Sequence, residues 1–301
     1  MRQLSFPVSQ KYDGIMVKSF LRGYCGVSAR LLVKLKRQPD GLTVNGKHIR
    51  SIDILHNGDI ICITMPDDEK QLEPKALSVS IAFEDDDILI VDKPYDMPVY
   101  PSPGHDCDSL ANAVAAYYLE HNEKLAFRPV YRLDKDTSGL LVLAKNAYSA
   151  ARLAFSIQKE YTAVCEKILS GSGTIDLPIR LKEGYGIQRE VGDDRGEKAV
   201  THWQAISSGN NHTLLALRLE TGRTHQIRVH LSHIGHPLAG DDMYGGSLKY
   251  IGRQALHCSQ VSFVHPVTGK SVLLFSNLPC DMQALSLACG FQNAQNMGRI
   301  E

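Results

Sequence analysis

The chain has 301 residues, 43% of them hydrophobic, which is enough for one large core or two unequal ones. Its 33 lysine and arginine residues balance 33 aspartate and glutamate residues, so the composition argues against a globally basic nucleic-acid binder. Its seven cysteines are scattered and form no Cys-x-x-Cys pair, which argues against a disulfide framework or a zinc knuckle and favours reduced thiols.

The sequence predicts neither a secretion signal nor a membrane span. Residues 1–7 lack the apolar stretch of a signal peptide. No run approaches the roughly 20 apolar residues that a membrane helix needs. We therefore expect a cytoplasmic protein that is not attached to a membrane.

Positive charge is concentrated near the N-terminus. Residues 1–64 contain ten lysine and arginine residues but only four aspartates and no glutamate, so this segment is net positive and the remainder is net negative. Such asymmetry is typical of a phosphate-binding unit appended to a mildly acidic body, although a solvated basic helix face would give the same composition.

The N-terminal segment combines two predicted helices with a short β unit. Residues 19–24 and 28–36 have apolar side chains at helical spacing, with basic residues between them. An Asn-Gly turn follows within residues 42–47, and residues 60–63 alternate as a strand. The pattern predicts a small α+β unit.

This succession resembles the S4 RNA-binding fold, in which two helices precede a V-N-G-K turn and a G-D-I-I strand. We assign residues 12–65 to the S4-like domain. The resemblance implies that Arg30, Lys34 and Lys47 face RNA phosphates, in agreement with the local positive charge.

A charged stretch that is poor in apolar residues follows this segment. Residues 66–75 are bounded near both ends by proline, which predicts a linker. We place the linker at residues 66–78 and a second domain at residues 79–301.

The second domain mixes predicted strands and helices without the strict alternation of a doubly wound fold. Strands are expected at residues 88–91, 139–144, 161–168, 198–206, 212–220, 255–264 and 271–275. Helices are expected at residues 109–119, 147–158 and 224–234, and from about residue 281 onward. The pattern predicts an α+β domain built on a large mixed or antiparallel sheet.

Residues 131–140 form the first polar cluster, between two apolar segments. Its centre is Asp134, with Arg132 and Lys135 close by. Loops at strand ends carry functional residues more often than strand interiors do. An ordinary charged hairpin turn would give the same pattern.

Residues 221–230 form the second cluster, at a predicted helix start. Threonines there can cap the helix, and a helix N-terminus attracts negative groups. Arg223 lies in or just before the first turn and can pair with a carboxylate or a phosphate through two hydrogen bonds. A surface helix with ordinary polar residues is the alternative interpretation.

A group of histidines in the same region suggests a metal site. Only the three-residue spacing of His230 and His233 suits one helical face, and the predicted helix contains no acidic ligand. Zinc needs three or four converging ligands. We therefore favour hydrogen-bonding or RNA-facing roles for these residues, which are His225, His230, His233 and His236.

Taken together, the clusters resemble the RluA-type family of RNA pseudouridine synthases. The matching segments occur in the family's order between residues 80 and 275. They are VDKP and VYP at residues 91–94 and 99–101, RLDKDTSGL at 132–140, KEYTA at 159–163, TGRTHQIRVH at 221–230, GHPL, GD and YG within 235–245, and ALH and HP at 255–257 and 265–266. Two positions depart from the pattern: Tyr131 stands where the family usually has histidine, and Met97 where it usually has glycine.

The resemblance implies roles for individual residues. Asp134 is expected to be the catalytic carboxylate, and Arg223 to pair with it and keep it ionised. Tyr161 is expected to stack on the target base and to help to remove a proton, with a half-buried strand tyrosine as the alternative. Arg132 is expected to fill the place of the extruded base. The residues of this domain expected to contact RNA are Arg132, Lys135, Thr137, His225, Gln226 and Arg228.

The implied reaction breaks the N1–C1′ bond of a uridine in structured RNA, turns the base and rejoins it through C5. It needs no cofactor and no metal. We expect large-subunit ribosomal RNA as the substrate, with transfer RNA as the alternative, and a monomer with no obligatory protein partner. A non-catalytic RNA-binding or ribosome-assembly factor and a metal hydrolase built on the histidines are the competing hypotheses.

Overall fold

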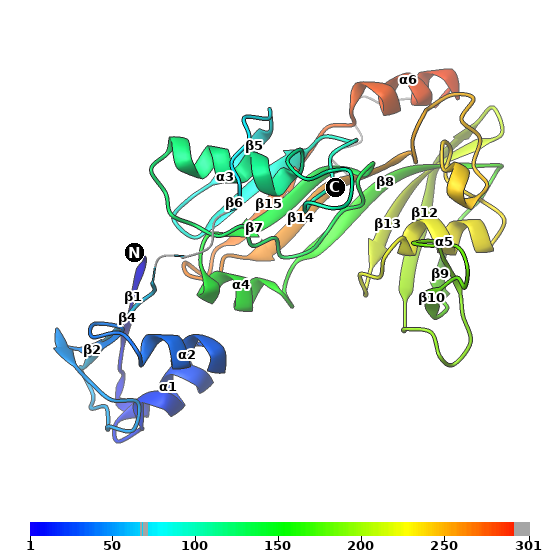
Figure 1. Cartoon of the computed structure of the whole chain (residues 1–301). Helices are drawn as coiled ribbons and strands as arrows, with labels where there is room; N and C mark the ends of the chain where they lie inside the picture. The colour runs from blue at the N-terminus through cyan, green and yellow to red at the C-terminus, as the bar shows by residue number, and fades with distance from the viewer. Residues whose placement is uncertain (67, 69–71, 292–301) are drawn as a thin grey trace.

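The computed structural model describes residues 1–66, 68 and 72–291 (Figure 1). Part of the predicted linker and the last residues of the predicted second domain, 292–301, lie outside this range. None of the described helices combines the length and the apolar character that crossing a bilayer requires.

The N-terminal domain is a four-stranded antiparallel sheet with two α-helices. The sheet order is β1-β4-β2-β3. The elements are β1 Gln3–Pro7, η1 Gln10–Tyr12, α1 Val17–Gly23, α2 Ala29–Leu35, β2 Leu42–Val44, β3 Lys47–His48 and β4 Ile60–Thr64. Because β1 pairs with β4, the domain includes residues before the predicted boundary at residue 12.

Apolar side chains of both helices and of β4 form the core of this domain. Phe20 and Leu35 are fully buried, as is Ile61 of β4. Asn45 and Gly46 have φ values of 51° and 78°, which the two-residue hairpin turn between β2 and β3 requires. The predicted helices, turn and strand are all confirmed.

The described residues of the second domain are built on one nine-stranded mixed sheet (Figure 1). Its order is β5-β6-β7-β14-β8-β13-β12-β9, with β15 paired to β14, and the only parallel neighbours among the described strands are β7 and β14. The strands are β5 Ser80–Glu84, β6 Ile88–Lys93, β7 Ser138–Ala144, β8 Gln158–Glu166, β9 Ser172–Asp176, β12 Val200–Gly209, β13 His212–Leu219, β14 Leu256–Val264 and β15 Ser271–Phe275. A separate hairpin joins β10 Ile179–Leu181 to β11 Arg189–Val191.

Within the part of the chain that the structure describes, four α-helices accompany the large sheet. They are α3 Leu110–Glu120, α4 Ala147–Leu153, α5 Gln226–His233 and α6 Cys280–Ala288, and a short 3-10 helix, η2, spans Asp242–Tyr244. The side chains of Ser109 and Asn146 accept hydrogen bonds from the first turns of α3 and α4 and so fix where these helices begin. The mixed sheet with few helices confirms the predicted α+β class.

Two predicted helices are shorter in the structure. The helix expected at residues 147–158 ends at Leu153, because Gln158 already pairs with β14 as the first residue of β8. The helix expected at residues 224–234 begins at Gln226, because His225 has a φ of 56° and cannot continue a right-handed helix.

Glycine is required where β7 meets β14. Gly139 has a φ of 109°, and a Cβ atom at this position would lie 2.3 Å from the carbonyl oxygen of Cys258. The glycine of the RLDKDTSGL motif therefore lets two parallel strands approach closely. This contact holds the start of β7, and the turn before it, at the centre of the sheet.

Candidate active site

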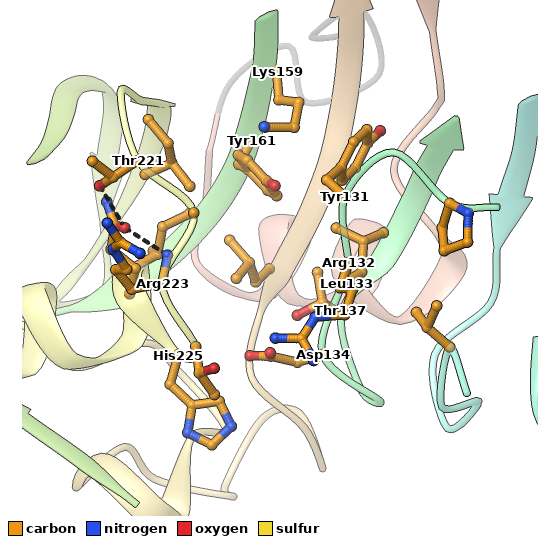
Figure 2. Close-up of a pocket in the computed structure, with 18 of the residues that line it drawn as sticks. Tyr131, Arg132, Leu133, Asp134, Thr137, Lys159, Tyr161, Thr221, Arg223 and His225 are labelled. Atoms are coloured by element: carbon orange, nitrogen blue, oxygen red, sulfur yellow. Dashed lines mark hydrogen bonds between the residues drawn. The ribbon is translucent and has the colours of Figure 1, made fainter. Parts of the chain in front are cut away.

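A cavity of about 1040 Å³ lies over the central strands of the second domain. Its wall combines the turn before β7, the first half of β8 and the loop before α5 (Figure 2). Three of the polar segments singled out in the sequence therefore share one cavity. Its polar lining includes Arg132, Asp134, Lys159, Tyr161, Arg223 and His225.

Asp134 lies in the turn before β7 and contacts a buried arginine of α5. The Nη1 atom of Arg228 is 3.4 Å from Oδ2 of Asp134, whose side chain is 26% exposed. The same guanidinium binds Asp241 through two hydrogen bonds, Nε to Oδ2 at 2.7 Å and Nη2 to Oδ1 at 2.8 Å. The fully buried Asp241 thus orients Arg228, which presents its remaining amino group to Asp134.

Arg228 is a permanent cation in this position. Burial opposes its charge, but the hydrogen bonds and the charge of Asp241 outweigh burial and raise the pKa of Arg228 above its ordinary value. Its fixed positive charge lies next to the carboxylate of Asp134. The arrangement holds a half-buried carboxylate in the cavity wall, where it can take part in nucleophilic or acid–base chemistry.

The predicted pair of Asp134 and Arg223 is wrong. Arg223 donates from Nε to the carbonyl oxygen of Lys198 at 3.0 Å, and its Nη1 lies 3.4 Å from Oε1 of Glu197. The left-handed backbone at His225 turns the chain just before α5, so Arg228 in the first helical turn reaches Asp134 instead.

Tyr161 lies on β8, and its side chain faces the same cavity (Figure 2). The residue is only 5% exposed. Burial, followed by the neighbouring Cys258 and Asp134, raises the pKa of Tyr161 well above its ordinary value. Its phenol therefore stays neutral near pH 7 and offers an uncharged ring beside Asp134.

Two buried basic side chains that the sequence reasoning missed hold the turn that carries Asp134. Lys93 donates from Nζ to three backbone carbonyls, including that of Lys135 at 2.8 Å. Arg253 donates from Nη1 to the carbonyl oxygen of Asp136 at 2.9 Å and forms an ion pair with Asp281 of α6. Lys93 lies in the quoted VDKP segment, but an apolar strand pattern gives no sign that the lysine after it is buried.

Three residues expected to contact RNA have their side chains engaged inside the protein. Gln226 is buried and joins the loop before α5 to β12, donating to the carbonyl oxygen of Val200 and accepting from the amide of Arg223. Thr137 is buried against Gln254, and Arg228 is held by its two carboxylates. These residues shape the cavity wall.

The other residues expected to contact RNA lie at the surface or on the cavity wall. Arg132 is exposed at the cavity, and Lys135 forms an ion pair with Asp96 at 2.9 Å. In the N-terminal domain the three basic residues singled out are all exposed, namely Arg30, Lys34 and Lys47.

The histidines of the 225–236 region do not converge. His225 is hydrogen-bonded through Nδ1 to the Tyr244 hydroxyl at 2.8 Å, and His230 is held by Thr201 and by a backbone carbonyl. Burial lowers the pKa of both His225 and His230, so both are neutral at pH 7. Their hydrogen bonds point in separate directions and do not suit a shared metal ion.

Among the described residues, one group of side chains has metal-ligand spacing, namely Asp85, Asp87 and His265. The oxygens of Asp87, however, accept hydrogen bonds from Arg2 and Asn146. A carboxylate that already accepts hydrogen bonds from these two side chains suits an internal polar contact better than a metal site.

Comparison with known proteins agrees with the geometry. A family model described as RNA pseudouridylate synthase matches residues 87–233. The uncharacterized RNA pseudouridine synthase YjbO of Bacillus subtilis (strain 168) is 36% identical over 271 residues, which cover 87% of this chain and 95% of the relative. Ribosomal large subunit pseudouridine synthase D of Escherichia coli (strain K12) is 38% identical over 238 residues, or 73% of each chain. The chain belongs to the RluA-type family of RNA pseudouridine synthases.

Solved structures support the same assignment. Human RNA pseudouridylate synthase domain containing 1 is similar with a TM-score of 0.55 and 25% identity, covering 68% of this chain and 86% of that one. The match to human RNA pseudouridylate synthase domain containing 4 has a TM-score of 0.57 at 23% identity, which shows the fold. The predicted family and its activity, the isomerisation of uridine in RNA, are confirmed. The synthase carries Asp134, Tyr161 and Arg228 within the segment that the family model matches.

Proposed function

We propose that this synthase converts specific uridines of large-subunit ribosomal RNA to pseudouridine, with Asp134 as its catalytic carboxylate. The contact of Asp134 with the buried Arg228, inside a cavity that also holds the ring of Tyr161, carries the proposal. The choice of RNA is supported by relatives in Escherichia coli and Haemophilus influenzae, whose names specify the large ribosomal subunit.

The cavity suits a uridine that has left its stack. A base within a helix cannot reach a carboxylate in a cavity wall, so the nucleotide is extruded at a cost of about a few kcal/mol. The neutral ring of Tyr161 offers a stacking surface, and Asp134 then meets the sugar or the edge of the base. The exposed Arg132 is placed to occupy the space that the base vacates.

Each side chain has a defined task in the proposed reaction. Asp134 acts as the nucleophile or as the acid–base group while the N1–C1′ bond breaks and the C5–C1′ bond forms. Arg228 orients Asp134, and Asp241 fixes Arg228. The turn before β7 is held from both sides by Lys93 and Arg253.

The N-terminal domain is proposed to bind phosphates without reading sequence. It has the two helices and the hairpin turn expected of an S4-like fold, and Arg30, Lys34 and Lys47 are exposed on it. Basic side chains of this kind add affinity for any RNA backbone and leave the choice of uridine to the cavity.

Tritium release from RNA tests the catalytic assignment. Large-subunit ribosomal RNA transcribed with [5-³H]uridine loses tritium when a pseudouridine forms, because C5 exchanges its hydrogen for the sugar bond. We expect release by the wild type and a loss of about 10³-fold or more in Asp134→Asn, which keeps the shape but removes the carboxylate. RNA binding by the variant should stay close to that of the wild type, because Asp134 acts in the chemical step.

Asp136→Asn is the matched control, because Asp136 lies two residues away and its backbone, not its carboxylate, contacts Arg253. Equal activity in wild type and Asp134→Asn would exclude the assignment of Asp134. Release from transfer RNA transcripts but not from ribosomal RNA would replace the proposed substrate. RNA binding without any release would indicate a non-catalytic factor.

A further inference from the structure

Lys159 brings an amino group into the cavity beside Tyr161. The two residues are two positions apart on β8, so their side chains lie on the same face of the strand. Both line the cavity, and Figure 2 shows Tyr161 between Lys159 and Asp134. In agreement with this order, the charge of Asp134 affects the pKa of Tyr161 but is not among the causes of the shift at Lys159.

Among the residues that the structure describes, no carboxylate and no hydrogen-bond acceptor contacts the amino group of Lys159. Its neighbour is the ring of Tyr131, whose centroid lies 4.8 Å from Nζ. The Tyr131 hydroxyl is fixed by a hydrogen bond to the carbonyl oxygen of Leu140 at 2.7 Å. The aromatic face holds the cation by its quadrupole but leaves its charge uncompensated.

The contrast between the half-buried Lys159 and the buried Lys145 shows which interaction Lys159 lacks. Lys145 forms ion pairs with Glu84 and Glu123, which raise its pKa in spite of burial. Burial lowers the pKa of Lys159 because no such partner lies nearby. An ammonium ion partly removed from water in this way is stabilised when an anion enters the site.

We propose that Lys159 binds a phosphodiester of the RNA strand beside the target uridine, at the end of the cavity away from Asp134. This inference rests on the proposed function, because an RNA strand entering the cavity is what brings the phosphate. Uracil itself offers only neutral carbonyl oxygens, which compensate a desolvated ammonium less well than an anion does. The 1040 Å³ cavity exceeds what one small ligand usually needs and leaves room for a flanking nucleotide.

The salt dependence of RNA binding tests the proposal. Fluorescein-labelled decauridylate is titrated with full-length protein by fluorescence anisotropy between about 50 and 200 mM salt. The logarithm of the binding constant falls linearly with the logarithm of the salt concentration. For a protein that neutralises one phosphate fewer on a single strand, this slope is shallower by about 0.7. We expect this decrease and weaker binding at low salt for Lys159→Met, whereas Lys159→Arg retains the wild-type slope.

Lys249→Met is the matched control, because Lys249 also lies 4.8 Å from a tyrosine ring, that of Tyr250, but outside the cavity. Its slope should equal that of the wild type. An unchanged slope in Lys159→Met, even with weaker binding, would overturn the proposal and indicate a contact with a neutral base. Equal losses in Lys159→Met and Lys159→Arg would also overturn it and indicate packing against Tyr131.

Two measurements keep the inference separate from the proposed function. Thermal unfolding of each variant shows that it is folded, and tritium release by the wild type shows that the enzyme acts on RNA. If the wild type releases no tritium, the proposed function fails, while the slope still decides whether Lys159 binds a phosphate.

Discussion

Arg228 connects two carboxylates, and its fork geometry decides how well Asp134 is oriented. Lysine keeps the charge but cannot bind Asp241 through two parallel hydrogen bonds while reaching Asp134. We expect Arg228→Lys to lower kcat for tritium release by about 100-fold, with little change in KM, because a displaced catalytic group costs rate rather than binding. Single-turnover and steady-state assays on the same RNA separate the two effects.

Arg223→Lys is the matched comparison, since Arg223 belongs to the same motif but is 37% exposed and pairs with Glu197. We expect it to change kcat far less than Arg228→Lys does. A larger loss in Arg223→Lys would mean that the two arginines exchange roles when RNA is bound.

The sequence identified the correct motif but the wrong arginine within it. Helical periodicity describes an ideal helix and does not reveal the left-handed residue His225, which sets where α5 begins. Helical periodicity also does not show that Asp241, eight residues beyond the end of α5, accepts a hydrogen bond from Arg228. Asp134 and Tyr161 line one cavity, as expected. Each belongs to a motif that lies on or next to a recognisable strand, β7 for Asp134 and β8 for Tyr161. Their catalytic roles remain predictions.

At the scale of elements, the turn before β7 depends on the buried Lys93. Burial lowers the pKa of Lys93 from 10.5 to about 7. The unfolded chain therefore binds a proton that the folded chain lacks between these two values, so this group makes the free energy of unfolding rise with pH. From pH 7 to about pH 9 the increase amounts to about 2 kcal/mol. We expect urea unfolding of Lys93→Met to lack this increase.

Lys145→Met provides the control for this pH dependence. The pKa of Lys145 is raised, so its proton stays bound in both states and its contribution is flat from about pH 7 to 9. If wild type and Lys93→Met gain stability equally over this range, Lys93 is protonated in the fold, where its three carbonyl acceptors favour the ammonium form.

The elements that the sequence predicted are those with long apolar patterns. Strands β6 and β7 are almost wholly buried, and their continuous apolar runs stand out. The strands that the sequence reasoning missed are short or half-exposed, so their alternation is weak: β1, β5, β9, β10 and β11. These segments form strands because they pair with strands that are distant in the sequence, and a local sequence pattern does not show such pairing.

At the scale of the whole molecule, the two domains are joined by specific contacts as well as by the chain. Tyr148 of α4 donates to the carbonyl oxygen of Cys25 at 2.9 Å and packs into the core of the N-terminal domain. Arg2 binds the buried carboxylate of Asp87 through Nε at 3.0 Å and Nη2 at 2.7 Å. Neither contact was predicted, because Arg2 lies before the assigned domain and the predicted helix at residues 147–158 gave no sign of what Tyr148 contacts.

These contacts should hold the basic N-terminal domain in one orientation relative to the cavity. The charged hydrogen bonds of Arg2 to Asp87 contribute about 2 kcal/mol and the neutral hydrogen bond of Tyr148 about 1 kcal/mol. Removing both contacts should therefore release the domain without unfolding either core. We expect Arg2→Ala combined with Tyr148→Phe to increase the maximum dimension in small-angle X-ray scattering. The double variant should also raise KM for RNA while leaving kcat unchanged, because the cavity is intact.

Arg50→Ala is the control, because it removes an exposed ion pair with Asp53 inside the N-terminal domain. It should change neither the maximum dimension nor KM. A scattering curve for the double variant that matches the wild type would mean that other contacts fix the domain.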